Sequence, residues 1–341
     1  MSRKPAQRKH DLTADSAQKE LVKLIQSFSY GHHLHTVFSD FVEMSALAIS
    51  NSADRAQFEA REKRYLEIVG KYKREEVERF PQMLGLLVES FEQRVAVIRK
   101  QTADGLPVSG GLTDVLGETY MMLGLGNDRA GQFFTPYSVS RMMSMMLMGD
   151  VGAEVERRGF LRVHEPACGA GGMVIAAADS ILAAGHNFQH SMHATCIDID
   201  PCCVHMTYVQ LSLLHVPATV VHGNALSMEV WGTWYTPAHI LGGWTFKLRR
   251  RLEADLLREA VAPEQQPDVD VAESPDVVQE VAVATEIETA DVEVLERETP
   301  RTTPAQVSRS ATSLAELFEQ SLASGTRERT VFDTIDQLTL F

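Results

Sequence analysis

The eight residues Glu-Pro-Ala-Cys-Gly-Ala-Gly-Gly, at positions 165–172, constrain the fold of this chain more than any other stretch. An apolar run at 160–163 precedes them and an alanine-rich run at 173–184 follows. This order predicts a strand, a tight glycine turn and a helix. Glycines let the backbone approach a ligand closely, and the first N–H groups of a helix attract polar ligands. Many strand–helix turns use glycine for geometry alone, so the surrounding residues must decide what this turn binds.

Short apolar runs alternate with helical runs on both sides of this turn. The runs at 161–164, 194–197 and 218–221 read as strands, and the segments between them have helical composition. Alternation of this kind predicts a parallel sheet with helical crossovers. We therefore expect residues 106–250 to form one α/β domain.

The rest of the chain differs in composition from this domain. Residues 1–105 are expected to be helical, because apolar residues such as Leu21, Leu24 and Ile25 recur at helical spacing. Residues 251–312 are expected to form an acidic, disordered linker, since from about position 261 they are rich in Pro, Glu, Asp and Thr and lack aromatic residues. Residues 313–341 are expected to hold a short amphipathic helix at 313–322 and a C-terminal peptide.

The net charge of −14 is concentrated in the C-terminal part of the chain. Residues 251–341 contain 20 acidic and 7 basic residues, so residues 1–250 are close to neutral. Charge therefore neither indicates nor excludes binding to nucleic acid by the α/β domain.

Hydropathy and cysteine spacing bear on where in the cell the protein is expected and on whether it binds a metal. No apolar run is long enough to span a bilayer and the polar N-terminus lacks a signal-peptide core, so we expect a cytoplasmic protein without a membrane partner. The four cysteines lie close together in the motif-bearing region and do not resemble a disulfide framework. Their spacing matches no paired Cys-x-x-Cys site, so no metal is expected.

Polar residues follow the second and third predicted strands. Asp198 ends the second strand, where an acidic residue commonly binds the ribose hydroxyls of a nucleotide. Asp200 is the alternative, although it is also placed to cap a helix that starts at Pro201. Asn224 ends the third strand and either reaches an adenine edge or forms a turn. The ends of parallel strands share one edge of a sheet, where ligands of α/β proteins bind.

A second polar segment, Gly-Gln-Phe-Phe-Thr-Pro at 131–136, lies upstream of the first strand. Its aromatic residues are suited to closing over a ligand, and the Thr135 hydroxyl can donate to a carboxylate. The same residues also suit the start of a helix, with Pro136 in its first turn.

Taken together, these segments resemble the motifs of adenine-N6 DNA methyltransferases. The resemblance comprises Asp-Val-Leu-Gly at 114–117 with Tyr120, the segment at 131–136, the glycine turn, Ile-Asp-Ile-Asp-Pro at 197–201 and Gly-Asn-Ala-Leu at 223–226. Order and spacing agree over residues 110–228. The similarity extends to modification subunits of type I restriction-modification systems and their plasmid or phage relatives.

This resemblance implies a Rossmann-like sheet that uses S-adenosylmethionine (SAM), with DNA as substrate or partner. It implies that the methionine end of SAM lies near Phe134, Thr135 and Pro136. It further implies ribose binding by Asp198 and adenine binding by Asn224. The turn from the first strand would hold the methionine backbone, through residues Glu165, Ala167, Gly169 and Gly171.

The catalytic signature of that family, Asp/Asn-Pro-Pro-Tyr/Phe, is absent, because no two of the 13 prolines are adjacent. In the family, this signature accepts the hydrogens of the target amino group and stacks on the flipped base. Residues 231–239 stand near its expected position and offer Trp234 or Tyr235 as a stacking ring and His239 as a base or hydrogen-bond acceptor. The alternative is aromatic packing against the sheet, which is the more common role of such residues. Only three or four strands can be placed, so either the sheet is abbreviated or a second methyltransferase or specificity subunit completes it.

The last five residues, Gln-Leu-Thr-Leu-Phe, resemble peptides that bind the bacterial sliding clamp. The resemblance implies a polar contact by Gln337 and apolar anchors at Leu338, Leu340 and Phe341; docking on the chain's own domain is the alternative. Two functions remain open at this stage. One is a SAM-dependent DNA adenine methyltransferase, and the other is an inactive SAM- or DNA-binding protein with a regulatory or anti-restriction role in a mobile element.

Overall fold

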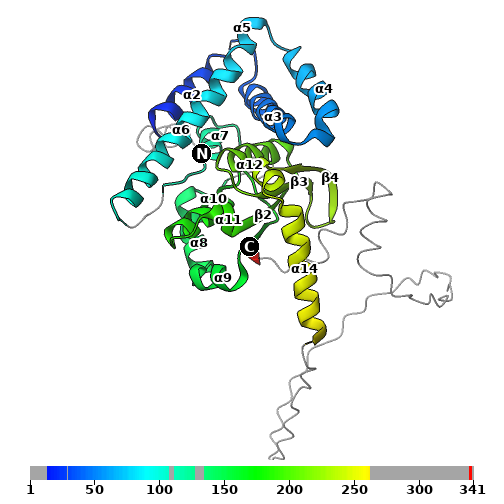
Figure 1. The fold of residues 1–341 in the computed structure, drawn as a ribbon. Coiled ribbons are helices and arrows are strands. Elements are labelled where there is room, and N and C mark those ends of the chain that lie inside the picture. Colours follow the sequence, from blue (N-terminus) through cyan, green and yellow to red (C-terminus); the bar gives the residue numbers. More distant parts are fainter. Residues whose placement is uncertain (1–13, 29, 107–110, 127–133, 262–337, 340–341) are drawn as a thin grey trace, which may run out of the picture.

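The computed structural model describes residues 14–28, 30–106, 111–126, 134–261 and 338–339 (Figure 1). Its centre is a sheet with the strand order β4-β3-β2-β1-β5. β1, β2, β3 and β5 are parallel to their neighbours, whereas β4 pairs antiparallel with β3. The strands are β1 (Leu161–Glu165), β2 (Met192–Asp198), β3 (Ala218–Asn224), β4 (Glu229–Tyr235) and β5 (Leu338–Thr339).

Helices connect the three parallel strands at the centre. α10 (Gly172–Ala183) and the short α11 (Phe188–Ser191) lead from β1 to β2, and α12 (Pro201–Leu213) leads from β2 to β3. α10 and α12 bury most of their residues, as helices that cover a parallel sheet must. The three strands expected from the sequence are confirmed as β1, β2 and β3, and the domain is a Rossmann-like α/β fold.

Helices precede the sheet along the chain; Figure 1 shows α2 to α6 gathered in blue and cyan on one side of it, whereas the green α8 and α9 lie apart from that group. α3 packs against α12 of the α/β region. The Arg61 guanidinium donates to the Thr233 carbonyl at 2.9 Å and lies 4.0 Å over the Trp234 ring. Trp234 thus packs between the two parts of the molecule. The helices and the 3-10 turn are α2 (Ser16–Gln26), α3 (Leu34–Ala53), η1 (Arg55–Gln57), α4 (Phe58–Val69), α5 (Arg74–Val77), α6 (Arg79–Ala103), α7 (Val115–Met122), α8 (Tyr137–Leu147) and α9 (Val151–Arg158).

After β4 the chain forms α13 (Pro237–Leu241) and α14 (Trp244–Val261). Residues 251–261, which the sequence analysis placed in the acidic linker, belong to α14. The helix projects away from the sheet in Figure 1. The expected linker from 262 to 312 and the expected helix at 313–322 lie outside the described residues. Within the described part of the chain, no helix is long and apolar enough to cross a membrane.

Only one side of β1 is paired along its whole length. All five residues of β1 pair with β2, whereas β5 pairs only with Val163 and His164. Among the described residues, the two-residue strand β5 is all that borders β1 on its outer side. The sheet is abbreviated on that side, as the sequence analysis allowed. β4 turns back antiparallel after a tight turn, and this direction decides where its aromatic residues lie.

The turn from β3 to β4 depends on a glycine. A Cβ at Gly223 would lie 2.3 Å from the carbonyl oxygen of Glu229, next to a register shift between His222 and Gly223. Gly232, on the facing strand, has open space around its Cβ position.

We therefore expect Gly223→Ala to destabilise the protein by about 1–3 kcal/mol, because backbone atoms must move to admit the methyl group. Gly232→Ala serves as the matched control and should change the free energy of unfolding by less than about 0.5 kcal/mol. Urea unfolding of the two variants measures both values. Equal changes in the free energy of unfolding for the two variants would show that the close approach of Gly223 to the Glu229 carbonyl does not constrain the turn.

Candidate functional site

The last residues of the three central strands meet at one edge of the sheet. Glu165, Asp198 and Asn224 are the final residues of β1, β2 and β3. The strands are parallel and adjacent, so these three polar side chains belong to the carboxyl edge. The glycine turn at 166–171 lies at the same edge because it follows β1 directly.

The glycine turn adopts backbone angles that favour glycine. Gly169 has φ +54° and Gly171 has φ +89°. A Cβ at Gly169 would lie 3.0 Å from the Phe134 ring, and one at Gly171 would lie 3.2 Å from the Thr207 hydroxyl. The turn is therefore enclosed by side chains on two sides, and Phe134 reaches it as the sequence analysis expected. Phe134 also packs against Tyr120 at 5.3 Å between ring centroids.

Asp198 ties this turn to the end of β2. Its Oδ2 accepts a hydrogen bond from the Gly169 N–H at 2.8 Å, and its Oδ1 accepts one from the Asp200 N–H at 2.9 Å. Burial raises the pKa of the Asp198 carboxyl. Each carboxylate oxygen has a second lone pair, so these bonds leave acceptor capacity for a ligand hydroxyl.

Asp200 has the structural role that the sequence analysis weighed as its alternative. Its Oδ1 accepts from the Cys202 N–H at 2.8 Å and caps α12, which begins at Pro201. Asn224 likewise forms a turn, because its Oδ1 accepts from the N–H groups of Leu226 at 3.0 Å and Ser227 at 3.4 Å. Asn224 remains partly exposed beyond this turn.

Glu165 is the most unusual group at this edge. It is 1% exposed, and its Oε1 accepts from the Ala167 N–H at 3.1 Å. Its Oε2 is buried and finds no hydrogen-bond partner in the described part of the chain. Burial raises the pKa of Glu165 to about 7, and the nearby charge of Asp198 raises it further. A buried acceptor without a donor is costly, and a bound cation or N–H donor would satisfy it.

The segment before α8 is only partly described. Gly131, Gln132 and Phe133 lie outside the described residues. Thr135 is exposed, and Pro136 directly precedes the first residue of α8. The segment thus leads into a helix, but Pro136 is the N-cap residue and lies before the first turn, and no side chain caps the helix.

Sequence reasoning missed two buried polar residues of α12 that support the turn. The Thr207 hydroxyl donates to the Gly169 carbonyl at 2.9 Å. The Gln210 amide donates to the Ala170 carbonyl at 2.8 Å and to Asp114 Oδ1 at 2.7 Å. Thr207 and Gln210 stand three positions apart in a largely buried helix, so they share one face. Two polar residues at this spacing in a buried helix were the available signal.

Tyr235 and His239, the catalytic candidates from the sequence, do not lie at the carboxyl edge. Because β4 is antiparallel, Tyr235 pairs with Thr219 near the start of β3, whereas Glu229 pairs with Asn224 at its end. His239 follows Tyr235, so it too lies at the amino edge. The structure therefore does not bring these two residues together with the glycine turn.

His239 is also fully engaged where it lies. Its Nδ1 is 2.8 Å from His193 Nε2, and its Nε2 is 3.0 Å from the Thr245 hydroxyl. Burial lowers the pKa of His239 to about 4, so the imidazole is neutral at physiological pH. A hydrogen-bonded, neutral pair of imidazoles has a structural role at this position.

The aromatic residue of β4 that faces the carboxyl edge is Trp231. It lies near the start of β4, is 49% exposed and contacts His222 edge-on at 5.0 Å. His222 in turn contacts the Ile199 carbonyl at 3.2 Å. Ile199 and Leu226 are exposed next to Asp198 and Asn224, at 60% and 96%. The edge thus combines buried polar groups with exposed apolar side chains.

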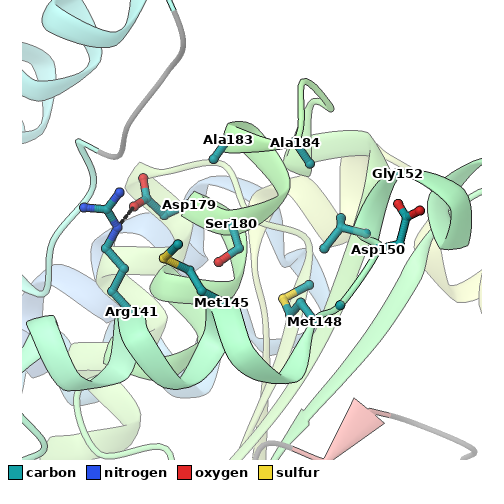
Figure 2. Close-up of a pocket in the computed structure, with 11 residues that line it drawn as sticks. Arg141, Met145, Met148, Asp150, Gly152, Asp179, Ser180, Ala183 and Ala184 are labelled. Carbon is teal, nitrogen blue, oxygen red and sulfur yellow. Dashed lines mark ion pairs between the residues drawn. The ribbon is translucent and has the colours of Figure 1, made fainter.

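Other sites in the described part of the chain do not compete with this edge. The four cysteines are buried and form no disulfide with one another, and no group of three metal-binding side chains comes together among the described residues. The cavity of Figure 2 lies between α8, α9 and α10 and shares no lining residue with the glycine turn.

The raised pKa of Glu165 has a measurable consequence. The folded protein favours the protonated carboxyl of Glu165, so ionisation of this group lowers the free energy of unfolding. This loss of stability is absent below about pH 4.5 and has reached its full size above about pH 7.5. Relative to Glu165→Gln, the wild-type protein should lose on the order of 3 kcal/mol of stability as the pH rises through this window. Urea unfolding of both proteins at pH 5 and pH 8 tests this expectation. A stability difference that does not change with pH would contradict it.

Comparison with known proteins agrees with the sequence motifs. Residues 113–241 match the model of the family described as N-6 DNA methylase. A search of curated proteins finds no match. Among solved structures, a candidate class I S-adenosylmethionine-dependent methyltransferase from Listeria monocytogenes matches with 12% identity and a TM-score of 0.35, over 62% of this chain and 55% of that one. The chain thus spans about half the length of that protein.

The family match falls on the segment that contains the glycine turn, Asp198 and Asn224, and it confirms the resemblance found in the sequence. This family implies S-adenosylmethionine as the cofactor. Residues 113–241 are therefore similar to the N-6 DNA methylase family.

Proposed function

We propose that this protein binds SAM at the carboxyl edge of its sheet and acts on or at DNA as a relative of adenine-N6 methyltransferases. The observation that supports this most directly is the buried Glu165 Oε2, which has no hydrogen-bond partner among the described residues. SAM carries an ammonium group on its methionine end, and a carboxylate is the natural partner for it. Asp198, at the end of the neighbouring strand, is suited to the ribose hydroxyls.

The remaining site residues fit the other parts of SAM. The glycine turn, with Ala167, Gly169 and Gly171, would lie against the methionine backbone, because these residues leave room for close approach. Phe134, beside Gly169, would cover the methionine end together with Thr135 and Pro136. Asn224 would contact the adenine edge. This assignment gives every polar group at the edge a partner in the cofactor.

Apolar side chains at the same edge suit the adenine ring. Ile199 and Leu226 are exposed beside Asp198 and Asn224, and Trp231 stands on the adjacent strand. Exposed large apolar residues are costly in water, and a flat aromatic ring packs well against them. Their position favours a purine as the ligand over a purely polar molecule.

Methyl transfer needs groups that this chain does not provide at the site. The Asp/Asn-Pro-Pro-Tyr/Phe signature is absent from the sequence, and Tyr235 and His239 lie at the opposite edge. We infer that a second methyltransferase or specificity subunit, as in restriction-modification systems, supplies the groups that bind the target adenine. A domain that binds SAM and DNA without transferring methyl groups is the second candidate, and the missing signature is the observation that favours it.

The C-terminal peptide supports a further partner. Gln337, Leu338, Leu340 and Phe341 resemble a peptide that binds the replication sliding clamp, and a linker of many residues would let it act as a tether. Of the four, only Leu338 is among the described residues, and it pairs with β1 through its backbone. Removal of residues 337–341 should abolish retention of the protein on an immobilised bacterial clamp. Undiminished retention would exclude this peptide as the contact.

Calorimetry with SAM tests the proposed pocket. Asp198→Ala should weaken SAM binding at least about tenfold, because it removes the ribose acceptor and frees the Gly169 N–H. Asp200→Ala is the matched control, since Asp200 caps α12, and it should change the affinity by less than about threefold. An equal loss in both variants, or no SAM binding by the wild-type protein, would refute the pocket.

A methyl-transfer assay separates the two functions. The protein should incorporate tritiated methyl groups from SAM into mixed-sequence DNA only when the products of neighbouring genes are present. Incorporation by the protein alone would contradict the need for a second subunit. No incorporation in either case, with SAM binding intact, would leave the non-catalytic function.

A further inference from the structure

α8 buries small polar residues and exposes apolar ones, which is the reverse of an ordinary surface helix. Its buried residues are Ser140 and Ser144, whereas Met142, Met145 and Met146 are 55%, 63% and 76% exposed. A helix on the surface of a domain normally buries its apolar face. The inversion leaves three adjacent methionines in water.

The buried serines explain how α8 is attached to the domain. The Ser144 and Ser180 hydroxyls are 2.9 Å apart, and the Ser180 hydroxyl also donates to the Ala176 carbonyl at 3.1 Å. These small side chains let α8 lie closely along α10. Arg141 adds an ion pair with Asp179 at 3.3 Å, which is drawn in Figure 2. Tyr137 and Met143 of α8 also pack against the hydrophobic core, whereas Met142, Met145 and Met146 take no part in this attachment and are exposed.

The exposed side chains form one continuous stripe. Val139, Met142 and Met146 follow the i, i+3, i+7 spacing of one helix face, and Met145 adjoins them. We call these four residues the methionine face. Methionine is flexible and polarisable, so a stripe of this kind suits an apolar helix as its partner.

A cavity of about 330 Å³ borders the methionine face (Figure 2). Met145 and Met148 lie on one of its sides, and Ser180, Ala183 and Ala184 of α10 lie on the other. A hollow beside an exposed apolar stripe can receive a bulky side chain of a docked segment.

We propose that residues 313–322 of the same chain dock as a helix on the methionine face. These residues lie outside the described part, but their sequence places Leu314, Leu317 and Phe318 on one helical face. Phe318 supplies the bulky side chain, and an aromatic ring is a favourable neighbour for methionine sulfur.

The course of the chain favours this occupant over a separate protein. β5 returns to the sheet at Leu338 and Thr339 and pairs with β1. α10 contacts both β1 and α8, so β5 pairs with a strand that borders the same helix as α8. Only the 15 residues 323–337 separate the expected helix from β5, and a chain of this length spans up to roughly 50 Å when extended. The short tether keeps the helix at a high local concentration beside α8.

Disulfide trapping in the full-length chain tests the proposal. All four native cysteines are buried, so introduced surface cysteines are the ones that will react. The double variant Met145→Cys/Ser321→Cys places one thiol on the methionine face and one on the apolar side of the expected helix. Mild oxidation should give an intramolecular disulfide in the monomer.

Glu316→Cys combined with Met145→Cys is the matched control, because position 316 lies on the opposite side of the same helix and has the same tether. Its yield of intramolecular disulfide should be at least several-fold lower. Equal yields in the two variants would overturn the proposal. Covalent dimers in place of the intramolecular product would also overturn it and would assign the methionine face to a second copy of the chain.

A labelling experiment gives an independent readout. In full-length Met146→Cys protein, Leu314→Asp/Phe318→Asp should raise the rate of thiol labelling at position 146 several-fold, because the covering helix is displaced. Gln320→Asp/Ala323→Asp adds the same charge on the polar side and should leave the rate unchanged. An unchanged rate in the first variant would mean that residues 313–322 do not cover this face.

Discussion

The geometry of the site depends on the hydrogen bond between the Gly169 N–H and the Asp198 carboxylate. This bond joins the turn after β1 to the end of β2, and it requires the positive φ angle of Gly169. On the other side of the turn, Thr207 and Gln210 bind the carbonyls of Gly169 and Ala170. The turn is thus held from two strands and one helix before any ligand arrives, which lowers the entropy that binding must offset.

Gln210 extends this support to the segment before the sheet. Its amide donates to Asp114 Oδ1, and its Oε1 accepts from the Leu116 N–H at 3.1 Å. Asp114 also caps α7 through the Gly117 N–H, and burial raises its pKa to about 6. The motif at 114–117 therefore has a structural reason to occur with the glycine turn, since one glutamine satisfies both. Buried polar groups of this kind fix one arrangement of the elements that they join.

Sequence reasoning predicted the parts of the molecule that depend on local pattern. The strands β1, β2 and β3 follow from short apolar runs, and the cap of α12 follows from an aspartate before a proline. The direction of β4 could not be predicted. The alternation of apolar and polar residues along a strand is the same whether the strand runs parallel or antiparallel to its neighbour, and the residues at 225–228 carry no clear signal of a tight turn. That direction moves Tyr235 and His239 to the far edge and brings Trp231 to the near one. Thr207 and Gln210 were missed because their importance arises from long-range contacts to a turn that lies about 40 residues away in sequence.

The two edges of the sheet differ in how far their buried polar groups are satisfied, and this difference supports the proposal that a ligand binds at the carboxyl edge. At the amino edge, His239 has partners on both ring nitrogens, in His193 and Thr245, and its lowered pKa keeps the cluster neutral. At the carboxyl edge, Glu165 keeps an acceptor without a partner and has a raised pKa. A closed network gains nothing from a ligand, whereas a buried acceptor regains a hydrogen bond when a cation or N–H donor arrives. The free energy that Glu165 costs in the unliganded protein is therefore available for binding at the carboxyl edge, next to the glycine turn.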